Sequence, residues 1–111
     1  MHQNRLQKLL DFIENDPNDP FVLYALATEY NSLNDKDQVF SYYLRLVSDH
    51  PTYVGTYYHL GKLYEKNGEQ AVAITIYQQG MVAARNKGDM HAFSELQGAF
   101  NSASGLDYED D

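Results

Sequence analysis

The sequence predicts an all-α protein built from consecutive antiparallel helix pairs, an α-solenoid of about six helices. Two observations predict this class. The segment YHLGKLYEKNGE (58–69) repeats the pattern of YALATEYNSLND (24–35) at an offset of 34 residues. Within each copy, large apolar residues recur at the i, i+3, i+4 and i+7 spacing that places them on one face of a helix. A helical repeat of this length indicates pairs of helices that cover one another's apolar faces.

The first expected helix covers residues 4–15. Its apolar positions have helical spacing and are Leu6, Leu9, Leu10 and Ile13. The following DPNDP sequence is typical of a stop signal that ends a helix. Pro17 lies 34 residues before Pro51. We therefore interpret residues 4–15 as the second half of an incomplete repeat.

Two complete repeats follow, at residues 20–53 and 54–87. The first reads Leu23-x2-Leu26-Ala27-x2-Tyr30 and then Val39-x3-Tyr43, closing at Pro51. The second reads Tyr57-x2-Leu60-Gly61-x2-Tyr64 and then Ala73-x3-Tyr77. Arg85 stands where the first repeat has Pro51, so the last helix of the second repeat is expected to run further.

A final capping helix is expected over residues 89–103. It contains Phe93-x2-Leu96-Gln97-x2-Phe100, the first-helix spacing at an offset of 36 residues. Gly88 and Asp89 supply a lengthened turn and a helix cap. We expect residues 1–103 to form a single domain, and residues 104–111, which are rich in Gly, Asp and Glu, to form a disordered acidic tail.

These spacings and residue sizes resemble the tetratricopeptide repeat, a 34-residue helix-turn-helix unit. The resemblance covers residues 20–87 in two copies. The chain is similar to the small stand-alone bacterial members of the family. It implies a right-handed solenoid whose first helices line a concave groove for a partner peptide or protein segment. The resemblance therefore implies an adaptor or scaffold that binds proteins and has no chemistry of its own.

The resemblance also implies which residues line that groove. They are Tyr24, Thr28 and Asn31 of the first repeat and Tyr58, His59, Lys62, Glu65 and Lys66 of the second, with Ser94 and Asn101 added by the last helix. Lys62 and Lys66 are one helical turn apart, so both ammonium groups are expected to face a partner carboxylate. Tyr24 and Thr28 lack the charge and amide of chaperone-binding relatives, which argues against that specific partner.

Composition excludes several other classes of function. The net charge is −8, and four acidic residues lie in the last five positions. Such a charge disfavours nucleic acid and anionic membrane as partners. The sequence contains no Cys, which excludes disulfides and thiolate metal sites. It has neither a long apolar run nor a signal peptide, so the expected compartment is the cytoplasm.

The sequence carries no catalytic motif for a nucleophile, a phosphate or a metal. Four histidines are scattered without ligand spacing, at positions 2, 50, 59 and 91. His50, at a helix end, is expected to be structural. We therefore expect no enzymatic activity, no cofactor and no metal.

Aromatic and small residues predict how the helices pack. Tyr30, Tyr43, Tyr57, Tyr64 and Tyr77 occupy repeat positions and are expected in the core. In the pairs Tyr42-Tyr43 and Tyr57-Tyr58, neighbours point about 100° apart, so one ring of each pair should be partly exposed. Small residues are expected where helices cross, namely Ala27, Gly61, Ala73 and Gly80.

Two alternatives remain open at this stage. In the first, the chain is a self-assembly element whose end helices pack on another copy as a homodimer. Its contact surfaces would be the apolar stripes Leu6, Leu9 and Ile13 at one end and Phe93, Leu96 and Phe100 at the other. In the second, the acidic tail docks on the Lys62 and Lys66 patch of the same or another molecule.

Overall fold

The structure is a computed structural model that describes residues 2–106 and contains six α-helices over that range. The chain divides into two compact units. The first ends at Pro51 and the second begins at Thr52. The first unit contains α1 (His2–Asn15), α2 (Pro20–Ser32) and α3 (Lys36–Asp49). The second contains α4 (Gly55–Lys66), α5 (Gln70–Lys87) and α6 (Met90–Ser104).

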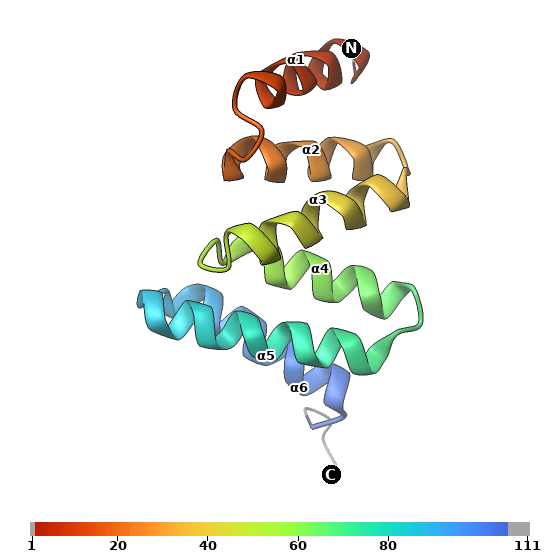
Figure 1. Cartoon of the computed structure of the whole chain (residues 1–111). Coiled ribbons are helices and arrows are strands. Elements are labelled where there is room, and N and C mark those ends of the chain that lie inside the picture. The colour runs from red at the N-terminus through yellow and green to blue at the C-terminus, as the bar shows by residue number, and fades with distance from the viewer. Residues whose placement is uncertain (1, 107–111) are drawn as a thin grey trace. The chain divides into compact units, whose positions relative to one another are not determined.

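The first unit is an antiparallel hairpin of α2 and α3, with α1 packed on α2 (Figure 1). Asp19 begins α2, because its carboxylate accepts a hydrogen bond from the backbone N–H of Phe21 at 2.9 Å and Pro20 follows it. Asp35 caps α3 in the same way through the N–H of Gln38 at 3.3 Å. Local sequence therefore sets where both helices of the hairpin begin.

Apolar side chains fill the space between the helices of this unit. The buried set is Leu23, Leu26, Ala27, Val39, Tyr43 and Leu46. Two hydrogen bonds fix α3 to the loop between α1 and α2. The Arg45 guanidinium donates to the Pro17 carbonyl at 2.6 Å, and His50 Nε2 lies 2.7 Å from the Asn18 carbonyl oxygen. The structural role predicted for His50 is confirmed by that contact.

One buried charge belongs to this core. The Glu29 side chain on α2 is only 5% exposed, and its Oε1 lies 2.9 Å from Nε of Arg5 on α1. Because a buried carboxylate is costly unless it is paired, this ion pair ties α1 to α2.

The second unit is an antiparallel hairpin of α4 and α5, with α6 packed mainly on α5 and also on α4 (Figure 1). Helix α5 has 18 residues against 14 in α3, which confirms that the second repeat runs further where Arg85 replaces a proline. Gly88 ends α5 with a φ of 77°, a conformation that favours glycine. Asp89 then caps α6 by accepting the N–H of Ala92 at 3.1 Å.

Two glycines allow the helices of the second unit to cross closely. A Cβ at Gly61 would lie 2.1 Å from Cε1 of Tyr77, and a Cβ at Gly80 would lie 2.5 Å from Cβ of Tyr57. Neither position has room for a methyl group, so each glycine offsets its poor helix propensity by letting an aromatic residue pack against the backbone. The prediction of small residues at the crossings is confirmed for Gly61 and Gly80.

The tyrosines divide partly as predicted. Tyr43, Tyr57 and Tyr77 are buried, whereas Tyr30 and Tyr64 are half-buried and so lie at the edge of the core. In each adjacent pair one ring is buried and its neighbour, Tyr42 or Tyr58, is half-buried, which confirms the prediction from helix geometry.

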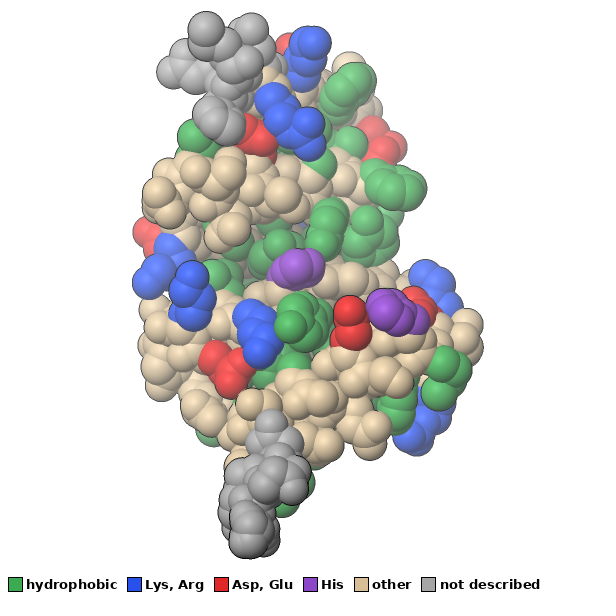
Figure 2. All heavy atoms as spheres, turned by 180° about the vertical axis from the view of Figure 1, so that it is seen from behind, with side chains coloured by type: hydrophobic (Ala, Val, Ile, Leu, Met, Phe, Trp, Pro, Cys, Tyr) green, Lys and Arg blue, Asp and Glu red, His purple; other side chains and the backbone are tan. Residues whose placement is uncertain are grey.

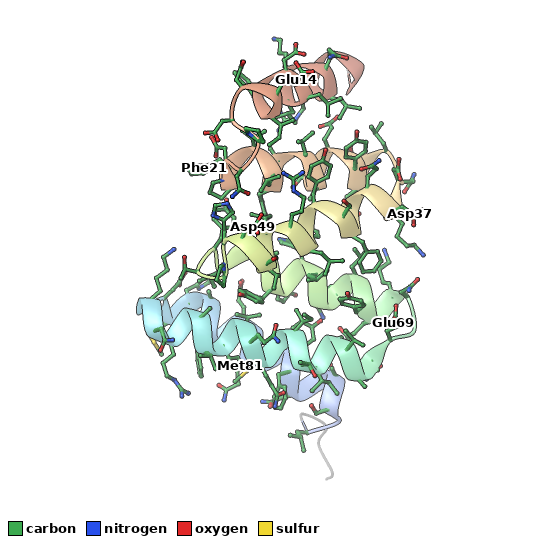
Figure 3. All side chains as sticks on the ribbon, viewed as in Figure 1. Glu14, Phe21, Asp37, Asp49, Glu69 and Met81 are labelled. Atoms are coloured by element: carbon green, nitrogen blue, oxygen red, sulfur yellow. The ribbon has the colours of Figure 1, made fainter. Side chains whose placement is uncertain are left out.

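The interpretation of both end stripes as exposed is wrong in part. Leu96 is 1% exposed, because α6 packs it against α5. Leu6, Leu9, Ile13, Phe93 and Phe100 are half-buried. The strongly exposed apolar side chains include Phe12 on α1. Phe21 at the beginning of α2, labelled in Figure 3, is also strongly exposed.

Helix ends differ from the predicted ranges by a few residues. The helix predicted at 4–15 begins at His2, and the helix predicted at 89–103 spans Met90–Ser104. Ser104 is therefore helical rather than the beginning of a tail, and residues 107–111 lie outside the described part of the structure. That residues 1–103 act as one domain stays a prediction.

Candidate functional site

The predicted groove residues of the first repeat all lie on α2. Tyr24 is half-buried, with its ring centroid 6.0 Å from that of Tyr43 on α3. Burial raises the pKa of Tyr43 to about 12, with a further increase from Tyr24 and a decrease from a hydrogen bond with Thr28. Tyr24 is thus partly a hairpin-packing residue, whereas Thr28 and Asn31 are exposed.

The predicted groove residues of the second repeat lie on α4, and the structure brings four of them together. The Lys62 ammonium lies 5.5 Å from the ring centroid of Tyr58, and the His59 ring meets the same tyrosine edge-on at 5.7 Å. Nζ of Lys62 also lies 3.7 Å from Oε1 of Glu65. We call these four residues (Tyr58, His59, Lys62 and Glu65) the α4 cluster.

A buried tyrosine on α5 holds the α4 cluster in place. The Tyr77 hydroxyl donates a hydrogen bond of 2.6 Å to Oε1 of Glu65, the oxygen that Lys62 also approaches. Burial raises the pKa of Tyr77 strongly, and the bond to Glu65 raises it further. Tyr77 therefore stays a neutral donor. Sequence analysis missed its contact with Glu65, although its repeat position predicted that it lies in the core.

His59 links the α4 cluster to α6. Partial burial lowers the pKa of His59, and the charge of Glu95 on α6 opposes that shift. Glu95 in turn lies 3.4 Å from Nε2 of His91, one turn away on the same helix. Sequence analysis also missed Glu95, because no repeat position identifies a residue that faces α4 from α6.

Lys66 is not held with Lys62 as predicted. Its side chain is exposed, and in the described part of the chain no ion pair or ring contact joins it to the α4 cluster. The Lys62 ammonium already contacts Glu65 and the Tyr58 ring. A joint role of the two lysines toward a carboxylate therefore stays a prediction, as does a contribution from Ser94, which is exposed, and Asn101, which is half-buried.

Charge is mixed over the face of the second unit that Figure 2 shows. Figure 2 shows that Lys or Arg, Asp or Glu, and His side chains are interspersed on this face of the unit. Within residues 2–106, the side chains that the structure describes include no group of three or more His, Cys, Asp or Glu placed to hold a metal ion. None of the helices over the same range combines the length and the apolar character required to cross a lipid bilayer.

Two hairpins with glycine or alanine crossings at a 34-residue period define a helical-hairpin repeat protein. Comparison with solved structures agrees with this class of protein. A crystal structure of a tetratricopeptide repeat domain protein from Salinibacter ruber is 45% identical, with a TM-score of 0.76, over 80% of this chain and 100% of that one. A solution structure of a tetratricopeptide repeat domain protein from the same organism is 44% identical, with a TM-score of 0.77, over 86% and 97% of the two chains.

The chain belongs to the tetratricopeptide repeat family, and its fold class is an all-α solenoid of helix pairs. A Bordetella parapertussis protein, 22% identical with a TM-score of 0.75 over 92% of this chain and 89% of that one, shares the fold. Neither protein-family models nor curated proteins gave a match. Domains of this kind are in general non-catalytic modules for protein interaction.

Proposed function

We propose that the chain is a non-enzymatic interaction module that offers the first helices of its hairpins, α2 and α4, to a segment of a partner protein. One observation supports this most directly. The α4 cluster places a half-buried tyrosine, a lysine over its ring and a histidine on one helix surface. The core does not need the exposed part of this arrangement.

The chemistry of the α4 cluster suits a polypeptide ligand. A partly exposed tyrosine offers apolar area and a hydroxyl together, a combination that is enriched at protein interfaces. Lys62 supplies a cation whose ammonium lies over that ring. Because Tyr77 and Glu65 already hold this cluster, the partner segment bears most of the ordering entropy, and affinity is expected on the order of micromolar.

The test uses the full chain as bait in extract from its native cells, followed by direct titration of the retained partner. Replacing Tyr58 and Lys62 with Ala should weaken binding at least tenfold, with helicity and melting almost unchanged. Tyr42→Ala is the matched control. Tyr42 is also half-buried, with the Arg45 guanidinium 5.6 Å from its ring centroid, but it lies on α3, the second helix of its hairpin. Equal affinity for the double variant and the control would remove the proposal.

Self-assembly is the second candidate, and one observation favours it. Phe12 on α1 is 59% exposed and is large enough to anchor a contact between copies. Sedimentation of the full chain at several concentrations decides between the candidates, since a monomer throughout contradicts self-assembly but not the interaction module. A role as a cytoplasmic adaptor stays a prediction.

A further inference from the structure

Helix α1 exposes a position that is buried in both complete repeats. Residues 34 apart hold equivalent places in the repeat, so Phe12 corresponds to Leu46 of α3 and Gly80 of α5. Leu46 and Gly80 are buried, whereas Phe12 is 59% exposed. In the second repeat the first helix covers this place, since Tyr57 of α4 packs against Gly80. The same face of α1 is therefore accessible to a first helix from another molecule.

Helix α6 exposes the complementary position. It has the first-helix spacing of the repeat, and Gln97 corresponds to Gly61 of α4 at an offset of 36 residues. In the second repeat the following helix covers Gly61, because Tyr77 of α5 packs directly on it. Gln97 is exposed, so the described part of the chain does not cover this place on α6. A second helix from another molecule has access to it.

An apolar hollow adjoins this face of α6. Its volume is about 320 Å³, and it is lined by Gln78, Met81, Val82, Arg85 and Phe100. Met81 lies on α5 (Figure 3), and Phe100 lies one helical turn from Gln97. Val82 is 58% exposed, so the hollow opens outward. It is large enough for one aromatic side chain, and it belongs to neither the hairpin core nor the α4 cluster.

Side-chain sizes fit a contact between α1 and α6 of two molecules. Within the second repeat, glycine at position 61 faces the large ring of Tyr77. In α1 the place of Tyr77 is held by Leu9, two repeat periods earlier, which is only half-buried. Because Leu9 is smaller than tyrosine, it suits a first helix that carries Gln97 instead of glycine. The larger residue on α6 is thus offset by the smaller residue on α1.

Charges also match at equivalent places. In the first unit the Arg45 guanidinium of α3 donates to the Pro17 carbonyl at 2.6 Å, which ties a second helix to the loop after α1. Asp11 of α1 corresponds to Arg45, and Arg85 of α5 corresponds to Pro17 after two repeat periods. If α1 of one molecule follows α6 of another, a carboxylate therefore meets a guanidinium. Asp11 also neighbours Phe12 in sequence, just as Arg85 lines the apolar hollow.

Both charged groups are accessible for this pairing. Asp11 is exposed, and one carboxylate oxygen accepts a hydrogen bond of 3.1 Å from Nε2 of Gln7. Arg85 is exposed, and its guanidinium lies 4.8 Å from the ring centroid of Phe93. A guanidinium that stacks on a ring keeps its N–H groups available at the edge. Neither existing contact has to break for the two side chains to pair.

We propose that copies of this chain associate head to tail, with α1 of one copy completing the half-repeat that α6 begins in another. Phe12 of the incoming α1 packs in the α5–α6 hollow, and Asp11 pairs with Arg85. The inference rests on self-assembly, the second candidate function, and names the surfaces that it uses. A contact between two different surfaces is heterologous, so it either closes into a ring or continues as a filament.

A charge-swap experiment on the full chain tests the contact. Sedimentation velocity over a range of concentrations should show a mass that rises with concentration for the unchanged chain. Asp11→Arg and Arg85→Asp should each weaken association about tenfold or more, because like charges then face one another. An equimolar mixture of the two variants should associate as the unchanged chain does, since the new positive charge of one meets the new negative charge of the other. A misfolded variant cannot be rescued in this way.

Two variants of α1 test the apolar part. Phe12→Ser should weaken association about tenfold or more, because the ring that fills the hollow is lost. Glu14→Arg is the matched control on the same helix (Figure 3) and should leave association unchanged, since Glu14 corresponds to the exposed Ser48 and Val82 of the two repeats.

The outcomes separate this contact from self-assembly in general. A monomer at every concentration overturns both. Association that persists in Asp11→Arg and Arg85→Asp overturns the head-to-tail contact alone and leaves self-assembly through another surface. Failure of the mixture to associate, with both single variants folded by circular dichroism, also overturns the contact, because Asp11 and Arg85 then do not meet.

Discussion

Gly80 offers the sharpest test of how the second unit is packed. Alanine there gains about 1 kcal/mol of helix propensity. Its Cβ, however, would lie 2.5 Å from Cβ of Tyr57 and 3.0 Å from Cδ1 of Leu96. Because a Cβ is fixed to its backbone, Tyr57 cannot swing away, and the cost falls in the upper part of the 1–3 kcal/mol typical of overpacking. We expect Gly80→Ala to lower the free energy of unfolding by about 1–2 kcal/mol.

Gly98 of α6 is the matched control. It is also inside a helix, but a Cβ there would meet nothing within 4 Å. Gly98→Ala should therefore raise the free energy of unfolding by about 1 kcal/mol. Urea unfolding followed by circular dichroism measures both variants, and the difference between them should be about 2–3 kcal/mol. If Gly80→Ala is as stable as Gly98→Ala, the close crossing of α4 and α5 is not as described.

Three further predictions test single contacts. Tyr77→Phe removes the hydrogen-bond donor to Glu65 and should lower the free energy of unfolding, measured in urea, by about 1 kcal/mol, since Glu65 remains partly solvated. Arg5→Ala removes the ion pair of the Glu29 carboxylate, which is 5% exposed, and should lower the free energy of unfolding by about 1–3 kcal/mol. Glu29→Gln in the Arg5→Ala background should recover most of this loss, and no recovery would contradict the explanation. The lowered pKa of His59 means that the unfolded chain binds the proton more tightly, so stability should fall as pH drops below about 6.5. His59→Gln should reduce this fall in unfolding midpoints measured between about pH 7 and 5, and an unchanged pH profile would assign it to other groups.

Repeat spacing predicted most of the helices because it depends on local geometry. The period of 34 residues located both hairpins, and the proline, aspartate and glycine signals placed their ends within a few residues. Small residues at the crossings were also predictable, since only Gly or Ala permits close approach of two helices. The α4 cluster was predicted only as a set of residues on one helix.

The contacts within that set were not predictable. Tyr77 was assigned to the core by its repeat position, yet its hydroxyl also donates to Glu65, at the oxygen that Lys62 approaches. Leu96 was interpreted as exposed, but the packing of α6 on α5 buries it. Both outcomes depend on how consecutive helices pack on one another and on side-chain direction, which spacing alone does not define.

By itself, the sequence determined the helix order, the repeat period and the apolar face of each helix, because these follow from backbone geometry and the burial of apolar surface within one segment. Tertiary structure alone decided which polar groups meet across helices: Glu29 with Arg5, Glu65 with Tyr77, and Glu95 near His59. It also placed Arg85 against the Phe93 ring beside an apolar hollow. The physical reason is that pairing energies fall steeply with distance, so they are set by packing between helices rather than by the residue types alone.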